Sequence, residues 1–281
     1  QTMNIGQFVA AEIIILLILS SVEKLIVSLE TVYDLFTAIE KIGQVTDLPL
    51  EGKSGMDIPH SELGFEIDFH NVRYENDLTS QTLLEGATFT IKPNARAIFH
   101  TDNTVSSNLI FGLIAGIYNP KEGSLSINNI PLGNLNRTFL RNRIGNMLTQ
   151  DLLVHATVLE NITLGRDYVS FGEVQTLCDR LLLSKQIQHL KEGYDTLLNP
   201  EGHFLAKDCI RKILIARALV GSPKLILLEE PLQDIKLDER EEILNVIFSS
   251  ENTTLLIQSD DELVVQRATQ TININQGLIT H

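Results

Sequence analysis

The sequence is poor in the residues that build several common functional sites. It has only two cysteines, Cys178 and Cys209, which lie far apart and match no metal-ligand spacing, so they indicate reduced thiols in a cytosolic domain. Its seven histidines form no pair at i and i+4, and its 22 basic residues form no run. Together with a net charge of −14, the missing basic clusters argue against a nucleic-acid partner, since phosphate contacts need grouped Lys and Arg.

Glycine and lysine are both missing from Thr101 to Leu109. This stretch follows a short apolar run and precedes a helical apolar pattern, a layout typical of a phosphate-binding loop, G-x-x-x-x-G-K-Ser/Thr. In such a loop, glycines let backbone N–H groups close around phosphates, the lysine neutralises charge and the hydroxyl holds Mg²⁺. The corresponding positions here are Thr101, Thr104, Ser106, Ser107 and Asn108. The stretch therefore predicts either an altered phosphate loop or an ordinary strand-turn-helix corner.

A long apolar segment begins near the start of the chain. Residues 6–21, GQFVAAEIIILLILSS, contain Glu12 as their only acid, and apolar residues then recur at helical spacing as far as Ile42. We predict one helix from about Asn4 to about Ile42, roughly 58 Å long at 1.5 Å per residue, which is enough to cross a bilayer and project beyond it. Glu12 would then face a helix bundle or an aqueous cavity, because an unpaired carboxylate in hydrocarbon is costly.

The rest of the chain has the pattern of a linker followed by a folded domain. Residues 47–64 are rich in Gly, Pro and acids and are typical of a linker. Residues 65–75 and 84–92 alternate apolar and polar side chains as half-buried strands do, whereas 224–228 and 253–258 are continuous apolar runs. Strands of both kinds, with helical patterns between them, predict an α/β domain with a mainly parallel sheet.

Three segments occur in a distinctive order after the altered loop: LTQ…ATVLENITLG, then GYDTLL, then IRKILIARALVGSPKLILLEEP. In this order they resemble the ATP-binding domain of ATP-binding-cassette (ABC) transporters, in the exporter class that carries membrane helices and ATPase domain on one chain. The preceding IGQFVAAEII…SVEKLI…AIEKIGQVTDLPLE is similar to the last membrane helix of such exporters, especially bacterial peptide or toxin exporters. The resemblance implies a P-loop NTPase-like domain with a mainly parallel sheet and a helical subdomain, after one long membrane-to-cytosol helix.

The resemblance also implies a division of the chain into three parts. Residues 1–46 would be the last transmembrane helix and its cytosolic extension, 47–64 the linker, and 65–281 the ATP-binding domain. Because the chain begins with Gln1 and not with Met, we expect a fragment of a longer protein.

Individual roles follow from the same resemblance. The glutamine that senses Mg²⁺ and the attacking water is kept as Gln150, and the general-base glutamate is kept as Glu230. Glu229 stands at the position of the aspartate that holds Mg²⁺, and Ser259 at that of the switch histidine. The aromatic residue that stacks on adenine is replaced by Asn76.

Two further positions depart from the family pattern at its dimer contacts. The signature turn, usually L-S-G-G-Q, is LAKDC, and its Asp208 would repel a γ-phosphate. The aspartate of the following dimer-contact turn is Lys236. Removing one preorganised donor commonly costs roughly 2.7 to 4 kcal/mol of barrier, and several donors are missing together.

These departures predict a pseudo-ATPase that binds no nucleotide, although ATP with Mg²⁺ is the ligand of the family. We expect the chain to act as a structural or regulatory half of an exporter, paired with a second ABC subunit as a homo- or heterodimer. It would lie in the bacterial inner membrane, with the ATPase-like domain on the cytoplasmic side. Two alternatives stay open: an active subunit that binds ATP through Thr104, Ser106, Ser107 and Asn108 with Glu230 as base, and a non-transport scaffold or decaying gene product.

Overall fold

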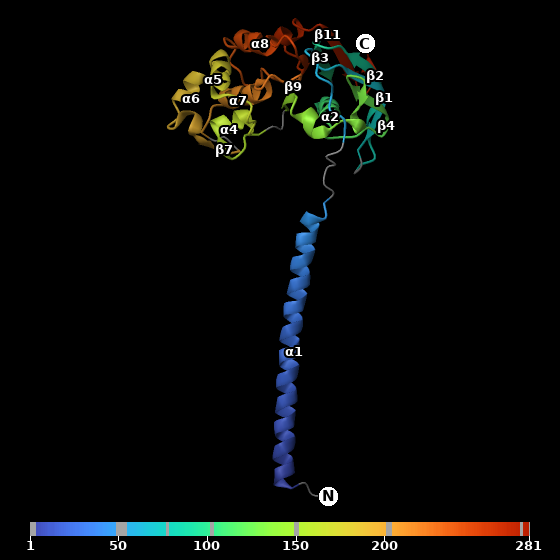
Figure 1. The fold of residues 1–281 in the computed structure, drawn as a ribbon, viewed down its shortest axis with the longest axis vertical. Helices are drawn as coiled ribbons and strands as arrows, with labels where there is room; N and C mark the ends of the chain where they lie inside the picture. Colours follow the sequence, from blue (N-terminus) through green and yellow to red (C-terminus); the bar gives the residue numbers. More distant parts are fainter. Residues whose placement is uncertain are drawn as a thin grey trace. The chain divides into compact units, whose positions relative to one another are not determined.

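The computed structural model describes residues 4–48, 55–76, 79–101, 104–148, 152–200, 204–275 and 278–280. The chain forms two compact units, Gln1–Gly52 and Lys53–His281 (Figure 1). The division falls inside the segment whose composition is typical of a linker.

The first unit is dominated by the helix α1, Ile5–Thr46. The predicted long helix is therefore confirmed, and it continues past Ile42. None of its residues is buried, and its length and composition suffice to cross a membrane. Hydroxyl groups along it donate to the carbonyl one turn earlier, as Ser21 does to Leu17 at 2.8 Å, which satisfies a polar side chain in an apolar helix.

The second unit is built on a six-stranded sheet in the order β12-β11-β3-β10-β9-β6. Its neighbouring strands are parallel except for β11 and β12, so the predicted mainly parallel sheet is confirmed. The strands are β3 (Arg96–Thr101), β6 (Ile144–Met147), β9 (Leu225–Glu229), β10 (Thr254–Gln258), β11 (Gln270–Asn275) and β12 (Leu278–Thr280).

The other named strands of the second unit form two smaller sheets. A four-stranded antiparallel sheet has the order β2-β1-β4-β5, and a separate pair joins β7 to β8. The strands are β1 (Ile67–Glu75), β2 (Thr82–Ile91), β4 (Glu122–Ile127), β5 (Ile130–Pro131), β7 (Ala156–Thr157) and β8 (Leu197–Leu198). Strands β4 and β5 form a hairpin. The chain turns at Asn128 and Asn129, whose φ angles of 49° and 64° suit the tight turn of a hairpin.

Ten shorter helical segments lie between the strands in the described part of the second unit. They are α2 (Thr104–Ile114), η1 (Leu132–Asn134), α3 (Arg137–Arg141), α4 (Val158–Thr163), α5 (Phe171–Arg180), α6 (Ser184–Gln188), η2 (Gly193–Asp195), α7 (Lys207–Leu219), α8 (Arg240–Phe248) and α9 (Glu262–Val265), counting η1 and η2 as 3-10 turns. In Figure 1, α4, α5, α6 and β7 gather at one end of the second unit. This group is the helical subdomain that the sequence resemblance implies.

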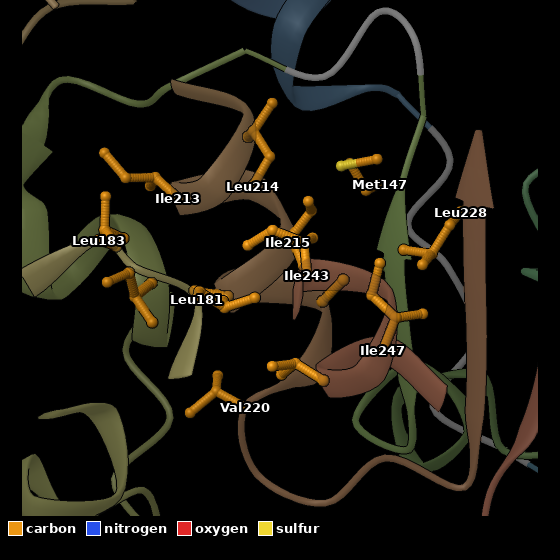
Figure 2. Close-up of a cluster of buried hydrophobic side chains, with 14 of the residues drawn as sticks. Met147, Leu181, Leu183, Ile213, Leu214, Ile215, Val220, Leu228, Ile243 and Ile247 are labelled. Atoms are coloured by element: carbon orange, nitrogen blue, oxygen red, sulfur yellow. The ribbon is translucent and has the colours of Figure 1, made fainter. Parts of the chain in front are cut away.

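The six-stranded sheet separates two hydrophobic cores because successive side chains of a strand point to opposite faces. Ile226 and Leu228 of β9 belong to one core, with residues of α7 and α8 (Figure 2). Leu225 and Leu227 belong to the other core, with residues of α2 and of the antiparallel sheet. Helix α7 passes so close to β6 that a Cβ on Gly145 would lie 1.7 Å from the carbonyl oxygen of Ala218.

The described part of the linker segment, residues 55–64, packs on the second unit and is called the strap below. Met56 forms a parallel bridge to Leu135 through two backbone hydrogen bonds with residues 134–136, at 2.7 and 2.9 Å. Ile58 is buried in the core. A Cβ on Gly64 would lie 2.3 Å from the first backbone nitrogen of β10, so the strap touches the sheet itself.

Candidate functional site

The candidate site lies where the parallel strands β3, β9 and β10 end. β10 pairs with β3 on one side and with β9 on the other, so their carboxyl ends meet at one edge of the sheet. Ligands of open α/β sheets bind outside such carboxyl ends. The structure therefore brings together three predicted site residues, Glu229 and Glu230 after β9 and Ser259 after β10.

The connection from β3 to α2 is shorter than a phosphate-binding loop. β3 ends at Thr101 and α2 begins at Thr104, which leaves residues 102 and 103 between them. In the loop pattern, the second glycine and the lysine fall at Ser106 and Ser107, yet both positions already belong to the helix. Their side chains and that of Thr104 lie outside what the structure describes. Asn108, one turn into α2, is partly buried.

The connection differs from a family phosphate-binding loop in its residue types and in where its helix begins. That loop needs several backbone N–H groups to turn inward around the phosphates, and glycines give the backbone the freedom to do so. Here helical backbone starts before the second glycine position, with no glycine from Thr101 to Leu109. The stretch thus lacks the glycines and the lysine of the family pattern, and α2 begins three positions after the first glycine position.

Glu230 is held by residues from the neighbouring strand. Its backbone N–H donates to the carbonyl oxygen of Gln258 at 2.8 Å, and its φ is 45°. The Gln258 side-chain amide donates to Oε1 at 3.2 Å, and the Ser259 hydroxyl donates to Oε2 at 3.0 Å. Burial raises the pKa of Glu230, the charge of Asp260 adds to the rise, and the two hydrogen bonds oppose it. Each carboxylate oxygen therefore already accepts a hydrogen bond from the chain.

Glu229 lies deeper than its neighbour and shares its surroundings with a guanidinium group. It is buried and stands opposite Gln258 in the β9-β10 register. Arg211 of α7 is also buried; burial lowers its pKa, while Asp234, Glu230 and Glu229 act to raise it. Among the described residues, no group of three or more His, Cys, Asp or Glu side chains could hold a metal ion. The acidic end of β9 thus has a cation of the chain itself nearby.

The two cysteines lie in the core of the helical subdomain. Cys178 of α5 and Cys209 of α7 are free thiols and both are buried. Burial raises the pKa of each thiol to about 11, so neither is a ready nucleophile or metal ligand at neutral pH.

Asn76 has a structural role at the end of the β1-β2 hairpin. Its N–H donates to the Gln81 carbonyl at 2.9 Å, and its side-chain oxygen accepts from the Thr79 amide at 3.3 Å. The nearest aromatic ring, Tyr74, packs against the ring of Tyr118, with the centroids 5.6 Å apart. Asn76 thus has no aromatic ring that could stack on adenine, and the ring of Tyr74 already has an aromatic neighbour in the chain. Gln150 lies outside the described residues.

A second surface forms around α4 and the β7-β8 pair. Asn161 is fully buried, and its amide group donates to three backbone carbonyls between residues 154 and 157. Arg217 of α7 donates to the Asn161 side chain at 2.9 Å and to the Leu152 carbonyl at 3.0 Å. This network holds residues 152–157 rigidly. Leu152 and Val154, with Leu197 of β8, present large exposed apolar side chains there.

A cavity of about 730 Å³ lies near the amino ends of β9 and β10, away from the carboxyl ends that form the candidate site. It is lined by α5, by the end of α8 and by Lys224 and Thr253, which precede β9 and β10. No predicted site residue lines it, so it plays no part in the site described above.

Comparisons with known proteins agree with this architecture. A family model described as "ABC transporter" matches residues 84–233. The chain is similar to the alpha-hemolysin translocation ATP-binding protein HlyB of Escherichia coli O157:H7, with 26% identity over 279 residues, covering 99% of the chain and 39% of that protein. It is also similar to the leukotoxin export ATP-binding protein LtxB of Aggregatibacter actinomycetemcomitans, with 23% identity over 278 residues, covering 99% of the chain and 39% of that protein. The chain thus spans about two fifths of the length of these relatives.

A solved structure described as a bacterial Atm1-family ABC exporter with ATP bound matches with a TM-score of 0.77 and 22% identity. The match covers 88% of this chain and 43% of the other. At this identity the likeness establishes the fold alone.

Proposed function

The chain belongs to the ABC transporter family, and on that premise we propose that it is the C-terminal part of an exporter whose ATP-binding domain no longer holds nucleotide. Its residues 1–46 supply a transmembrane helix, 47–64 a linker and 65–281 the degenerate domain. The names of its relatives, which refer to translocation and export, support the exporter class. The chain acts as a structural or regulatory half of the transporter.

One observation carries the loss of nucleotide binding. Helix α2 begins at Thr104, inside the stretch where the family loop would still be wrapping phosphate, and that stretch contains neither glycine nor lysine.

The partner is a second ABC subunit with its membrane domain, and the bilayer is the bacterial inner membrane. The surface of Leu152, Val154 and Leu197 supports this assembly, since exposed apolar side chains on a rigid backbone suit a protein contact. Replacing Leu152 and Val154 by Glu should leave the unfolding temperature unchanged and remove copurification of the membrane partner. Copurification at the native level would contradict this role.

The decisive experiment is calorimetric titration of the full chain in detergent with Mg-ATP up to the millimolar range. We expect no saturable heat from the native chain. A variant with the loop pattern restored, Thr101→Gly, Thr104→Gly, Ser106→Gly, Ser107→Lys and Asn108→Ser, should gain saturable binding. Saturable binding by the native chain would overturn the proposal and favour an active subunit with a non-standard site.

A further inference from the structure

A closed network of charges joins the start of α7 to the turn after β9. Asp208 accepts a hydrogen bond from the Gln186 side chain at 2.7 Å and lies 3.8 Å from the Lys212 ammonium group and 3.7 Å from that of Lys236. Lys212 also donates to the Glu239 carboxylate at 2.7 Å. We call Asp208, Lys212, Lys236 and Glu239 the α7 lock. Its two acids and two lysines balance in charge.

Burial makes the members of the α7 lock depend on one another. The side chain of Lys212 is 0% exposed and that of Asp208 is 8% exposed, whereas Lys236 is 60% exposed. A buried ion persists only with its partners, because an unpaired charge away from water is costly. Burial opposes ionisation of Asp208, yet the hydrogen bond from Gln186 and the charges of Lys212 and Lys236 together lower its pKa.

The network ties together elements that are separate in the sequence. Gln186 belongs to α6, Asp208 and Lys212 to α7, and Lys236 and Glu239 to the segment between β9 and α8. A neighbouring hydrogen bond from Arg211 to the Gln233 side chain, at 2.8 Å, joins the same two segments again. The helical subdomain is therefore fastened to the end of β9 by charged contacts within this one chain.

The carboxylate of Asp208 also supplies a negative charge at the N-terminal end of α7. This residue stands in the first turn of the 13-residue helix, where unpaired N–H groups and the helix dipole favour an anion, and the N–H of Cys209 is hydrogen-bonded to its carboxylate. The end of α7 is thus already supplied with a negative charge. An additional anion there would meet that charge directly.

We propose that Asp208 is the built-in anion of α7, and that the α7 lock keeps the helical subdomain fastened to the turn after β9 in the absence of any nucleotide. This inference rests on the proposed function. The charged side chains of the α7 lock, and not a bound phosphate, hold the helical subdomain against the turn after β9. The negative charge of Asp208 would also repel the phosphate groups of a nucleotide bound to a partner subunit.

The test is hydrogen exchange of the full chain in detergent, followed at residues 207–211 and 235–239. Asp208→Asn should speed exchange in both segments by roughly tenfold, since hydrogen bonds to a charged group are lost. Asp238→Asn, an equal charge change at an exposed neighbouring position, is the matched control and should change neither segment. Lys236→Met tests the same lock from an exposed side chain, and Lys236→Arg should restore native exchange.

Added pyrophosphate tests the exclusion of anions. Residues 207–211 should gain protection from millimolar pyrophosphate in Asp208→Asn and not in the native chain or in Asp238→Asn. Equal exchange in Asp208→Asn, Lys236→Met and Asp238→Asn would overturn the lock, and protection of the native chain by pyrophosphate would overturn the exclusion. These readouts need no ATP, so a native chain that binds ATP in calorimetry would overturn the proposed function separately.

Discussion

Single side chains decide what the carboxyl edge of the sheet can do, and Glu230 is the most informative of them. Because burial raises its pKa, the folded chain favours the protonated form more than the unfolded chain does. The stability that this form provides is fully present below the pKa of the unfolded chain and is lost as pH rises through the folded pKa.

At about pH 8, Glu230→Gln should therefore be as stable as the native chain or more stable. The gain in the free energy of unfolding should be less than about 1 kcal/mol, because water screens a partly exposed carboxylate. Gln258, whose Oε1 is buried without a hydrogen-bond partner, can turn its amide to accept from the new side chain. Thermal unfolding at about pH 4 and about pH 8 checks this, and the difference should shrink in acid. If the substitution instead abolished a measurable ATP turnover, Glu230 would be a working base.

Lys212 and Lys236 both pair with Asp208, but only Lys212 is buried. Lys212→Met leaves Asp208 and Glu239 without their buried partner and should cost about 3 to 5 kcal/mol in the free energy of unfolding. Lys236→Met removes an exposed ammonium group and should cost less than about 1 kcal/mol. Denaturant unfolding followed by circular dichroism measures both, and equal losses would mean that burial does not govern this network.

The family resemblance assigned Glu229, Glu230 and Ser259 to one site, and the structure places them after the neighbouring parallel strands β9 and β10. The sequence could not reveal that Gln258 and Ser259 hold the two oxygens of Glu230, since such bonds depend on the register of β9 and β10. Nor did it show that Lys212 is buried with two acids. A lysine on a helix is ordinarily solvated, and only the packing of α7 against α6 and the turn after β9 removes it from water.

At the scale of the elements, close packing of β6 and α7 sets a strict limit on side-chain volume. Gly145→Ala should cost about 3 kcal/mol or more, because its Cβ would lie 1.7 Å from a backbone oxygen of α7 that cannot move independently. Gly133→Ala is the control, since nothing lies within 4 Å of its Cβ. A small and similar change in unfolding temperature for both variants would show that α7 can shift away from β6.

Elements with a strong internal pattern were predictable, and short ones were not. The apolar runs of β9 and β10 predicted the positions of these strands within one residue. The two-residue strands β5, β7 and β8 have no period of their own and exist through pairing with a neighbour. The early start of α2 likewise depends on the place and direction in which the chain leaves β3. A loop pattern in the sequence does not predict either of these.

At the scale of the whole molecule, α1 is the described helix whose length and composition suffice to cross a membrane. Leu16→Lys with Leu19→Lys places two charges in its most apolar part, and each should cost about 2.5 to 3.5 kcal/mol of membrane insertion. The variant should be extracted by alkaline carbonate, whereas the native chain should stay in the membrane pellet. Leu35→Lys with Ile39→Lys, in the part of α1 where charged residues already alternate, is the control and should pellet as the native chain does.

The strap has a mechanical consequence. Met56 is joined to residues 134–136 by a parallel bridge, so a tension applied along the chain at Gly55 loads its two hydrogen bonds together in shear. The load then passes through Ile58 to Gly64, where the chain presses against the beginning of β10. A pull on residues 55–64 would therefore reach the amino end of β10, a central strand whose other end is followed by Ser259, which donates a hydrogen bond to Glu230.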